Sequence, residues 1–114
     1  MPYLTIRTNQ SVDDKQCAAI LPKASRLVAQ MLNKPEEYVM VQLEPSACMA
    51  FAGTSEPLAF VELRAIGLPT NQTGELARGL CDFIRTEFGI PGERVFINFT
   101  GIPANLWGWN GETF

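Results

Sequence analysis

The stretch Pro35-x-Glu37-x-Val39-x-Val41-x-Leu43 recurs 56 residues later as Pro91-x-Glu93-x-Val95-x-Ile97-x-Phe99. Upstream of it, Tyr3-Leu4-x-Ile6-Arg7 is echoed 57 residues later by Phe60-Val61-x-Leu63-Arg64. Apolar residues at every second position are typical of half-buried β-strands. The chain therefore contains an internal repeat, and each copy is predicted to hold two strands.

Each copy also has a segment with helical spacing of apolar residues between its two strands. The first segment runs from about Asp13 to Leu32, and the second from about Asn71 to Phe88. Their apolar residues recur at intervals of three and four, which indicates amphipathic helices. Gly89 is expected to cap the second helix. Pro22 falls inside the first, where we expect a kink or a broken turn.

The order β-α-β, present twice, predicts an α+β fold in a single domain over residues 1–114, with repeats at about 1–56 and 57–114. Parallel strands joined by a helix form a right-handed unit. Two such units joined edge to edge give a four-stranded mixed sheet with both helices on one face. Short additional strands are expected at Cys48–Phe51 and at the C-terminus.

The alternation assigns each strand residue to one face of this sheet. The face under the helices receives Leu4, Ile6, Val39, Val41, Leu43, Val61, Leu63, Val95, Ile97 and Phe99. The opposite face receives Tyr3, Thr5, Arg7, Tyr38, Met40, Gln42, Phe60, Glu62, Arg64, Phe96, Asn98 and Thr100. This second face is too apolar for water and too polar for a dry core, so we expect it to contact other subunits of an oligomer.

Composition narrows the functional classes. The chain has 114 residues, 46% of them hydrophobic, and a net charge of −3, which argues against nucleic acid as a partner. No apolar run approaches the roughly 20 residues of a membrane span, and there is no signal-peptide pattern. We expect a cytoplasmic protein with no membrane partner, and release by a route without a signal sequence stays open. Three widely spaced cysteines are expected to be reduced thiols.

The chain contains no histidine. This excludes Ser–His and Cys–His nucleophile pairs and the common histidine-based metal sites. Any general base must then be a carboxylate, a lysine, a tyrosine, a thiolate or the N-terminal amine. Pro2 offers another base. Removal of Met1 would leave a secondary amine on a rigid strand, and burial or a nearby cation would lower its pKa. A Met-Pro start alone is weak evidence, because many chains share it.

Five blocks carry a resemblance to a known family. They are Met1-Pro2, Lys34-Pro35-Glu36-Glu37-Tyr38-Val39-Met40-Val41, Phe51-Ala52-Gly53-Thr54-Ser55-Glu56-Pro57, Ile66-Gly67 and Gly108-Trp109-Asn110-Gly111-Glu112-Thr113-Phe114. In this order they resemble the macrophage migration inhibitory factor family of the tautomerase superfamily. The resemblance implies a homotrimer with active sites at the subunit interfaces. It also implies a proline-catalysed keto–enol tautomerase that acts on phenylpyruvate-like α-keto acids and dopachrome-type compounds.

The resemblance assigns roles to individual residues. Pro2 would move a proton between the carbon beside a carbonyl and the enol oxygen. Lys34 would pair with the substrate carboxylate, although a solvated loop lysine is the plainer interpretation. The backbone N–H of Ile66 would contact the substrate. Asn98 would reach in from the neighbouring subunit, or else make an interface hydrogen bond.

Tyr38, Trp109 and Phe114 would form apolar walls for a flat substrate, although ordinary packing also explains them. Phe96 stands where animal members carry a tyrosine, so the pocket rim loses a hydroxyl. Arg64 replaces a histidine and could add a second carboxylate contact. Trp107 replaces a smaller residue and would narrow the pocket.

The C-x-x-C motif of animal members is replaced by Leu58-Ala59-Phe60-Val61, so thiol-reductase activity is not expected. This replacement and the Trp107-Gly108-Trp109 ending resemble a microbial or plant-like member more than an animal cytokine. Tautomerase activity that uses no metal and no organic cofactor is the leading prediction. A cytokine-like signalling or binding protein with a vestigial pocket, and a plain oligomeric scaffold, are the alternatives.

Overall fold

The computed structural model describes all residues from Met1 to Phe114. Its main elements are β1 (Pro2–Thr8), α1 (Asp14–Leu32), β2 (Met40–Glu44), β3 (Ala59–Ala65), α2 (Thr73–Phe88) and β4 (Val95–Gly101). Short elements connect and extend them: η1 (Glu36–Tyr38), η2 (Thr70–Gln72), η3 (Gly92–Arg94), η4 (Ala104–Leu106), β5 (Gly108–Trp109) and β6 (Glu112–Thr113). The β-α-β order, repeated twice, is confirmed.

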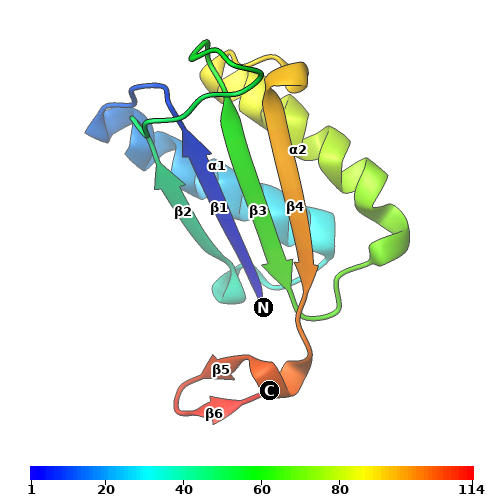
Figure 1. The fold of residues 1–114 in the computed structure, drawn as a ribbon. Helices are drawn as coiled ribbons and strands as arrows, with labels where there is room; N and C mark the ends of the chain where they lie inside the picture. Colours follow the sequence, from blue (N-terminus) through cyan, green and yellow to red (C-terminus); the bar gives the residue numbers. More distant parts are fainter.

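The four long strands form one mixed sheet in the order β2-β1-β3-β4. β1 is parallel to β2 and β3 is parallel to β4, whereas β1 and β3 pair antiparallel at the centre. Both helices cover the same face of this sheet, and the C-terminal hairpin β5–β6 extends beyond one end of it (Figure 1). The predicted α+β architecture is therefore confirmed.

The core lies between the sheet and the two helices. Its strand residues include Leu4, Ile6, Val61 and Leu63, each at most 1% exposed. The helices contribute Ala24, Val28, Leu32, Leu76, Leu80 and Ile84. The strand residues assigned by alternation to the covered face all belong to this core or pack against it.

The start of α1 and the end of α2 follow local sequence signals. Asp13 caps α1 by accepting a 2.7 Å hydrogen bond from the backbone N–H of Gln16, whose side chain bonds back to Asp13. Gly89 ends α2 in the left-handed conformation, at φ 70°, as predicted. Of the two outcomes expected at Pro22, a kink or a broken turn, the broken turn is wrong, because α1 continues through Pro22. Proline has no backbone N–H, so the carbonyl of Ala18 has no helical hydrogen-bond donor. Both Ala18 and Pro22 are exposed, so water can donate to that carbonyl instead. Neither helix combines the length and apolarity needed to cross a membrane.

The other face of the sheet is uncovered (Figure 1). Arg7 pairs with Glu44 at 2.9 Å and with Glu62 at 3.4 Å, and the Tyr3 hydroxyl donates to Gln42. Large apolar side chains stand beside these polar pairs, with Met40 65% exposed. This open face therefore mixes paired charges and bare apolar surface.

The two short extra strands expected from the sequence have different outcomes. The C-terminal strand is confirmed as the β5–β6 hairpin, which turns at Asn110 and Gly111, both at positive φ. The Cys48–Phe51 strand is wrong for the single subunit. Within that stretch only Phe51 has a ladder partner, and this partner is Thr54 across a tight turn.

The Phe51–Thr54 turn leads to a prediction about stability. Its two central residues, Ala52 and Gly53, both have positive φ, at 53° and 78°. Two such residues define a type I′ turn, which favours Asn-Gly, whereas alanine is strained there. Ala52 is exposed, so a larger side chain meets solvent. We expect Ala52→Asn to raise the free energy of unfolding by about 1 kcal/mol, measured by urea denaturation. An equal or lower midpoint would contradict this.

Candidate active site

Pro2 lies at the start of β1, in the middle of the sheet. Its side chain is buried, and its backbone pairs with Ala65 at the end of β3. The residue is fixed on one side by the antiparallel ladder and held in line with β1 by the buried Leu4. The Pro2 nitrogen therefore has a defined position at the edge of the core.

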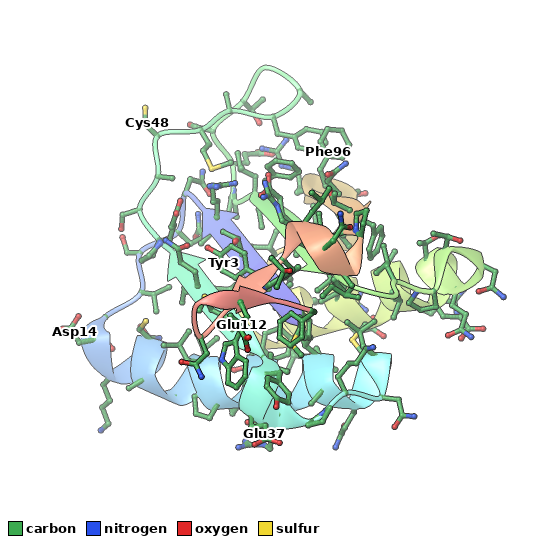
Figure 2. All side chains as sticks on the ribbon, turned by 90° about the horizontal axis from the view of Figure 1, so that it is seen from below. Tyr3, Asp14, Glu37, Cys48, Phe96 and Glu112 are labelled. Atoms are coloured by element: carbon green, nitrogen blue, oxygen red, sulfur yellow. The ribbon has the colours of Figure 1, made fainter.

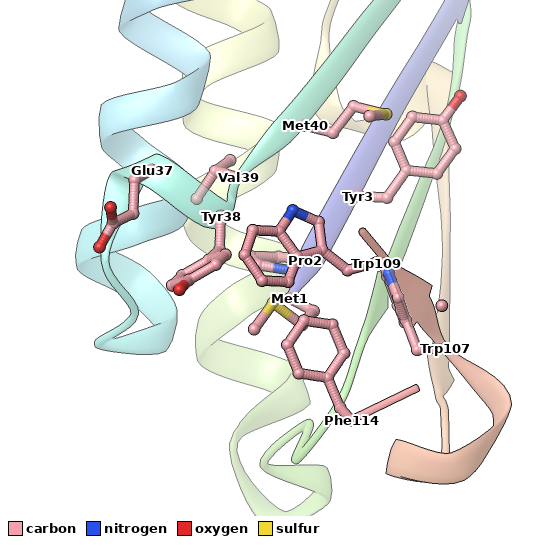
Figure 3. A pocket seen from close by; sticks show the side chains of 11 residues that line it. Met1, Pro2, Tyr3, Glu37, Tyr38, Val39, Met40, Trp107, Trp109 and Phe114 are labelled. Atoms are coloured by element: carbon pink, nitrogen blue, oxygen red, sulfur yellow. The ribbon is translucent and has the colours of Figure 1, made fainter. Parts of the chain in front are cut away.

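A cavity of about 280 Å³ opens beside Pro2. Eight of its eleven lining residues are hydrophobic, and they come from the N-terminus, the η1–β2 segment and the C-terminal hairpin. Figure 3 shows Met1 and Pro2 at the inner end of this cavity, with Tyr38, Trp109 and Phe114 around them. The cavity is thus a mainly apolar space next to the Pro2 backbone.

Three aromatic residues, Tyr38, Trp109 and Phe114, form the outer wall. The Trp109 and Phe114 rings stack with their centroids 6.0 Å apart and an interplanar angle of 17°. Tyr38 meets both rings edge-on, at 5.6 and 6.4 Å. Edge-to-face and offset pairs at these distances stabilise an aromatic cluster. The structure therefore brings together the three residues that the sequence analysis assigned to the walls.

Lys34 and Ile66 lie together on the other side of Met1. They line a second cavity, of about 270 Å³, which shares Met1, Tyr38 and Phe114 with the first. The position of Lys34 follows from the end of α1, because Asn33 adopts the left-handed conformation and the Lys34 N–H donates to the Ala29 carbonyl at 3.0 Å. The two cavities are therefore neighbouring parts of one site.

The backbone of Gly67 lies close to the end of the Lys34 side chain. A Cβ atom added at Gly67, whose φ is +68°, would lie 3.6 Å from the Lys34 Nζ atom. Ile66 directly precedes this glycine and is half-buried at the end of β3. A cation, a backbone segment and an apolar side chain thus meet beside the N-terminus.

The charge environment of this site acts on the N-terminal amine. Burial is the main cause that lowers the pKa of the Met1 ammonium, and the positive charge of Lys34 lowers it further. Both effects disfavour the protonated form. An amine at this end of β1 therefore loses its proton at a lower pH than an exposed amine does.

Arg64 lies beside Tyr3 in the β1–β3 ladder. Its side chain is 53% exposed, and its Nη2 atom lies 4.0 Å from a Glu62 carboxylate oxygen. Arg64 lines a third cleft, of about 300 Å³, together with Trp107, which also lines the Pro2 cavity. Trp107 thus stands between the Pro2 cavity and the arginine, so the structure places Arg64 near the site but outside the first cavity.

Asn98 and Phe96 are not brought to Pro2 within one subunit. Pro2 is level with Gly101 of β4 through the β3 ladder, and Asn98 and Phe96 lie three and five residues back along β4. At about 3.3 Å per residue these offsets correspond to about 10 and 17 Å. Figure 2 shows Phe96 on the side of the sheet away from α1, like the loop that carries Cys48.

The structure adds residues that the sequence analysis did not assign to the site. Tyr3, Glu37, Val39 and Met40 line the Pro2 cavity. Tyr3 and Met40 face each other across the β1–β2 ladder, so a correct register would have paired them. Their place in the cavity depends on the C-terminal hairpin, which no strand periodicity locates.

Comparisons with known proteins agree with this geometry. The family model described as macrophage migration inhibitory factor (MIF) matches residues 1–114. The chain belongs to this family. It is 35% identical to macrophage migration inhibitory factor from Xenopus tropicalis, over 100% of this chain and 99% of that protein. It is 36% identical to the homologue from Brugia malayi, with the same coverage.

A solved structure shows the same fold. The macrophage migration inhibitory factor homologue from Prochlorococcus marinus superposes with a TM-score of 0.92 at 37% identity, over 98% of both chains. The resemblance drawn from the five sequence blocks is therefore confirmed. Membership of this family supports a tautomerase-type isomerase or a cytokine-like function for the chain.

Proposed function

We propose that the protein is a keto–enol tautomerase for phenylpyruvate- and dopachrome-type substrates, with Pro2 as general base once Met1 has been removed. The observation that carries this proposal is the buried position of Pro2 at the inner end of an apolar cavity, with Lys34 close enough to influence an amine there. Positioned general bases typically contribute about 10²–10⁴-fold to a rate.

Removal of Met1 creates the base. While Met1 is present, the Pro2 nitrogen belongs to a peptide bond and has no basic lone pair. The freed secondary amine would occupy surroundings close to those of the Met1 amine, so burial and the Lys34 charge would lower its pKa in the same way. It would take the proton from the carbon next to the substrate carbonyl and deliver it to the oxygen of the resulting enolate, which becomes the enol hydroxyl.

The anchors of the substrate are assigned by charge and shape. Lys34 would bind the carboxylate of an α-keto acid as a flexible point charge, and the Ile66 backbone N–H would donate to the substrate. Tyr38, Trp109 and Phe114 would enclose a flat aryl group in the adjoining cavity. A ligand with a carboxylate at one end and a flat apolar body fits the two joined cavities.

Asn98 and Phe96 would complete the site from a neighbouring subunit. Their distance from Pro2 along the strands means that only another copy can supply them. The uncovered sheet face, with Met40 and Phe96 65% and 63% exposed, provides the surface for such an assembly. We propose a homotrimer that needs neither a metal ion nor an organic cofactor.

The test is an absorbance assay of phenylpyruvate tautomerisation, with protein whose intact mass shows that Met1 has been removed. We expect enzyme-dependent turnover above the buffer rate, since Pro2, Lys34 and the three aromatic side chains line adjoining cavities in which they could act as base, carboxylate anchor and walls. No turnover by the trimmed protein at any pH between 5 and 9 would contradict the proposal.

A cytokine-like binding function is the alternative that the family membership also supports. It would hold if the trimmed protein were inactive and the protein were found outside intact cells, bound to a specific surface partner. In that case the pocket would have been changed by its departures from the animal members, at Phe96, Arg64 or Trp107.

A further inference from the structure

One arginine outside the Pro2 site holds the loop beside Phe96. Arg94 ends η3 directly before β4, and its guanidinium donates to four backbone carbonyls of the preceding loop. The acceptors are Phe51 at 2.8 Å, Glu56 at 2.9 Å, Pro57 at 3.3 Å and Thr54 at 3.4 Å. Guanidinium groups suit such a task because they offer five donors in a fixed plane.

These hydrogen bonds hold a loop that has little regular structure of its own. Between β2 and β3 the only ladder pair is the Phe51–Thr54 turn. The carbonyls bonded by Arg94 lie on both sides of the Ser55 position, so the same group fixes the turn and its return to β3. Asn9 supports the return to β3, because its amide donates to the Ser55 and Glu56 carbonyls at 2.8 and 3.3 Å. Arg94 alone bonds the Phe51 and Thr54 carbonyls from a side chain outside the turn, so the turn is the part of the loop that depends on it.

Arg94 also determines the position of an aromatic pair. Its Cζ atom lies 5.2 Å from the centroid of the Phe51 ring, within the range of a cation–π contact. The Phe51 ring in turn lies 4.5 Å from the Phe96 ring. Phe96 is 63% exposed, and its aromatic neighbours are Phe51 and, across the β3–β4 ladder, Phe60. Phe60 is fixed by the sheet, whereas Phe51 depends on the loop that Arg94 holds.

We infer that Arg94 is a positioning residue for the active site of a neighbouring subunit: through Phe51 it fixes Phe96, which closes the substrate pocket of the next copy. This inference rests on the proposed function, because it needs the Phe96 of one subunit to meet the Pro2 cavity of another. A ring held at the wrong angle weakens contact with a flat substrate and leaves the base untouched.

The kinetic expectation follows from that separation of roles. Arg94→Ala should raise KM for phenylpyruvate by about 3- to 10-fold, the factor that corresponds to one aromatic contact, with kcat within about twofold. The pH profile should not move, because Lys34 and Pro2 keep their surroundings. The KM of Arg94→Lys should lie between those of the wild type and Arg94→Ala. A lysine keeps the positive charge but loses the planar array of donors.

Two further variants separate positioning from folding. Phe51→Leu removes the ring and leaves the Arg94 hydrogen bonds to the loop carbonyls, so it should raise KM in the same direction even if Arg94→Ala does not fold. Arg85→Ala is the matched control, because Arg85 is exposed on α2 and pairs only with Asp82, at 2.7 Å. It should leave KM unchanged.

Subunit mixing tests whether the effect crosses an interface. A Pro2→Gly subunit keeps Arg94, and an Arg94→Ala subunit keeps Pro2, so co-expression with two affinity tags yields mixed oligomers containing intact composite sites. We expect these oligomers to show a component with the wild-type KM, which neither variant shows alone.

The outcomes are distinct for the inference and for the proposed function. A wild-type KM in both Arg94→Ala and Phe51→Leu, or mixed oligomers without the wild-type component, would overturn the positioning role of Arg94. Full activity in the Pro2→Gly protein would overturn the proposed function instead.

Discussion

Replacing Pro2 by glycine is expected to lower kcat for phenylpyruvate by about 10²–10⁴-fold, the range that a positioned general base contributes. The trimmed variant keeps an N-terminal amine, but this amine is primary and rotates freely about the N–Cα bond, whereas the proline ring fixes that bond. The measurement is the steady-state rate by absorbance, at the pH where the unmodified enzyme is fastest.

Two comparisons show whether the loss belongs to the base. Protein that retains Met1 should be at least as inactive as Pro2→Gly, because its Pro2 nitrogen is an amide. Pro2 is also buried, so the variant must be shown by thermal unfolding to be folded at the assay temperature. A folded Pro2→Gly protein with unchanged turnover would mean that another group moves the proton.

The fold could be predicted because its signals are periodic and repeated. The alternation through Leu4 and Ile6, and again through Val61 and Leu63, determines which face is covered, and the structure buries all four. A shift of one residue would reverse the faces, so the pattern strongly specifies the arrangement. The repeat then supplies the topology.

The incorrect fold predictions concern segments whose state depends on tertiary context. Pro22 should interrupt a helix that stands alone, but Ile20 and Ala24 on either side of it are buried against the core and hold α1 together. The Cys48–Phe51 segment has strand-like composition, but within the subunit only Phe51 finds a strand partner. The strand propensity of a segment does not show whether another strand lies beside it.

The site was less accessible to sequence reasoning than the fold. Periodicity contains nothing that brings Lys34, which follows α1, to Ile66, which follows β3. Only the family resemblance indicated both. Tyr3 and Met40 were assigned to the correct face, but their place in the Pro2 cavity depends on where the C-terminal hairpin folds. Such contacts are non-local and have no signature of their own.

Neutralising Lys34 should change both binding and pH dependence. Lys34→Gln is expected to raise KM for phenylpyruvate by about 10- to 100-fold, because a charge-assisted hydrogen bond to the carboxylate is replaced by a neutral one. It should also shift the acid limb of the kcat/KM profile to higher pH. Burial and then the Lys34 charge lower the pKa of the Met1 amine, and we expect the same effect on the Pro2 amine that replaces it. Removing the Lys34 charge would therefore favour the protonated Pro2 amine, and only the free base is active.

Lys15→Gln is the matched control for this prediction. Lys15 is an exposed lysine in the first turn of α1, whereas Lys34 directly follows the last turn. The two charges are thus separated by nearly the whole helix, about 26 Å at 1.5 Å per residue. Beyond a Debye length of about 8–10 Å the Lys15 charge is screened, so KM and the acid limb should both stay at their wild-type values. Equal shifts in the two variants would show a response to net charge and remove Lys34 from the substrate anchor. A higher KM with an unmoved acid limb would keep Lys34 as the anchor and assign the tuning of Pro2 to burial alone.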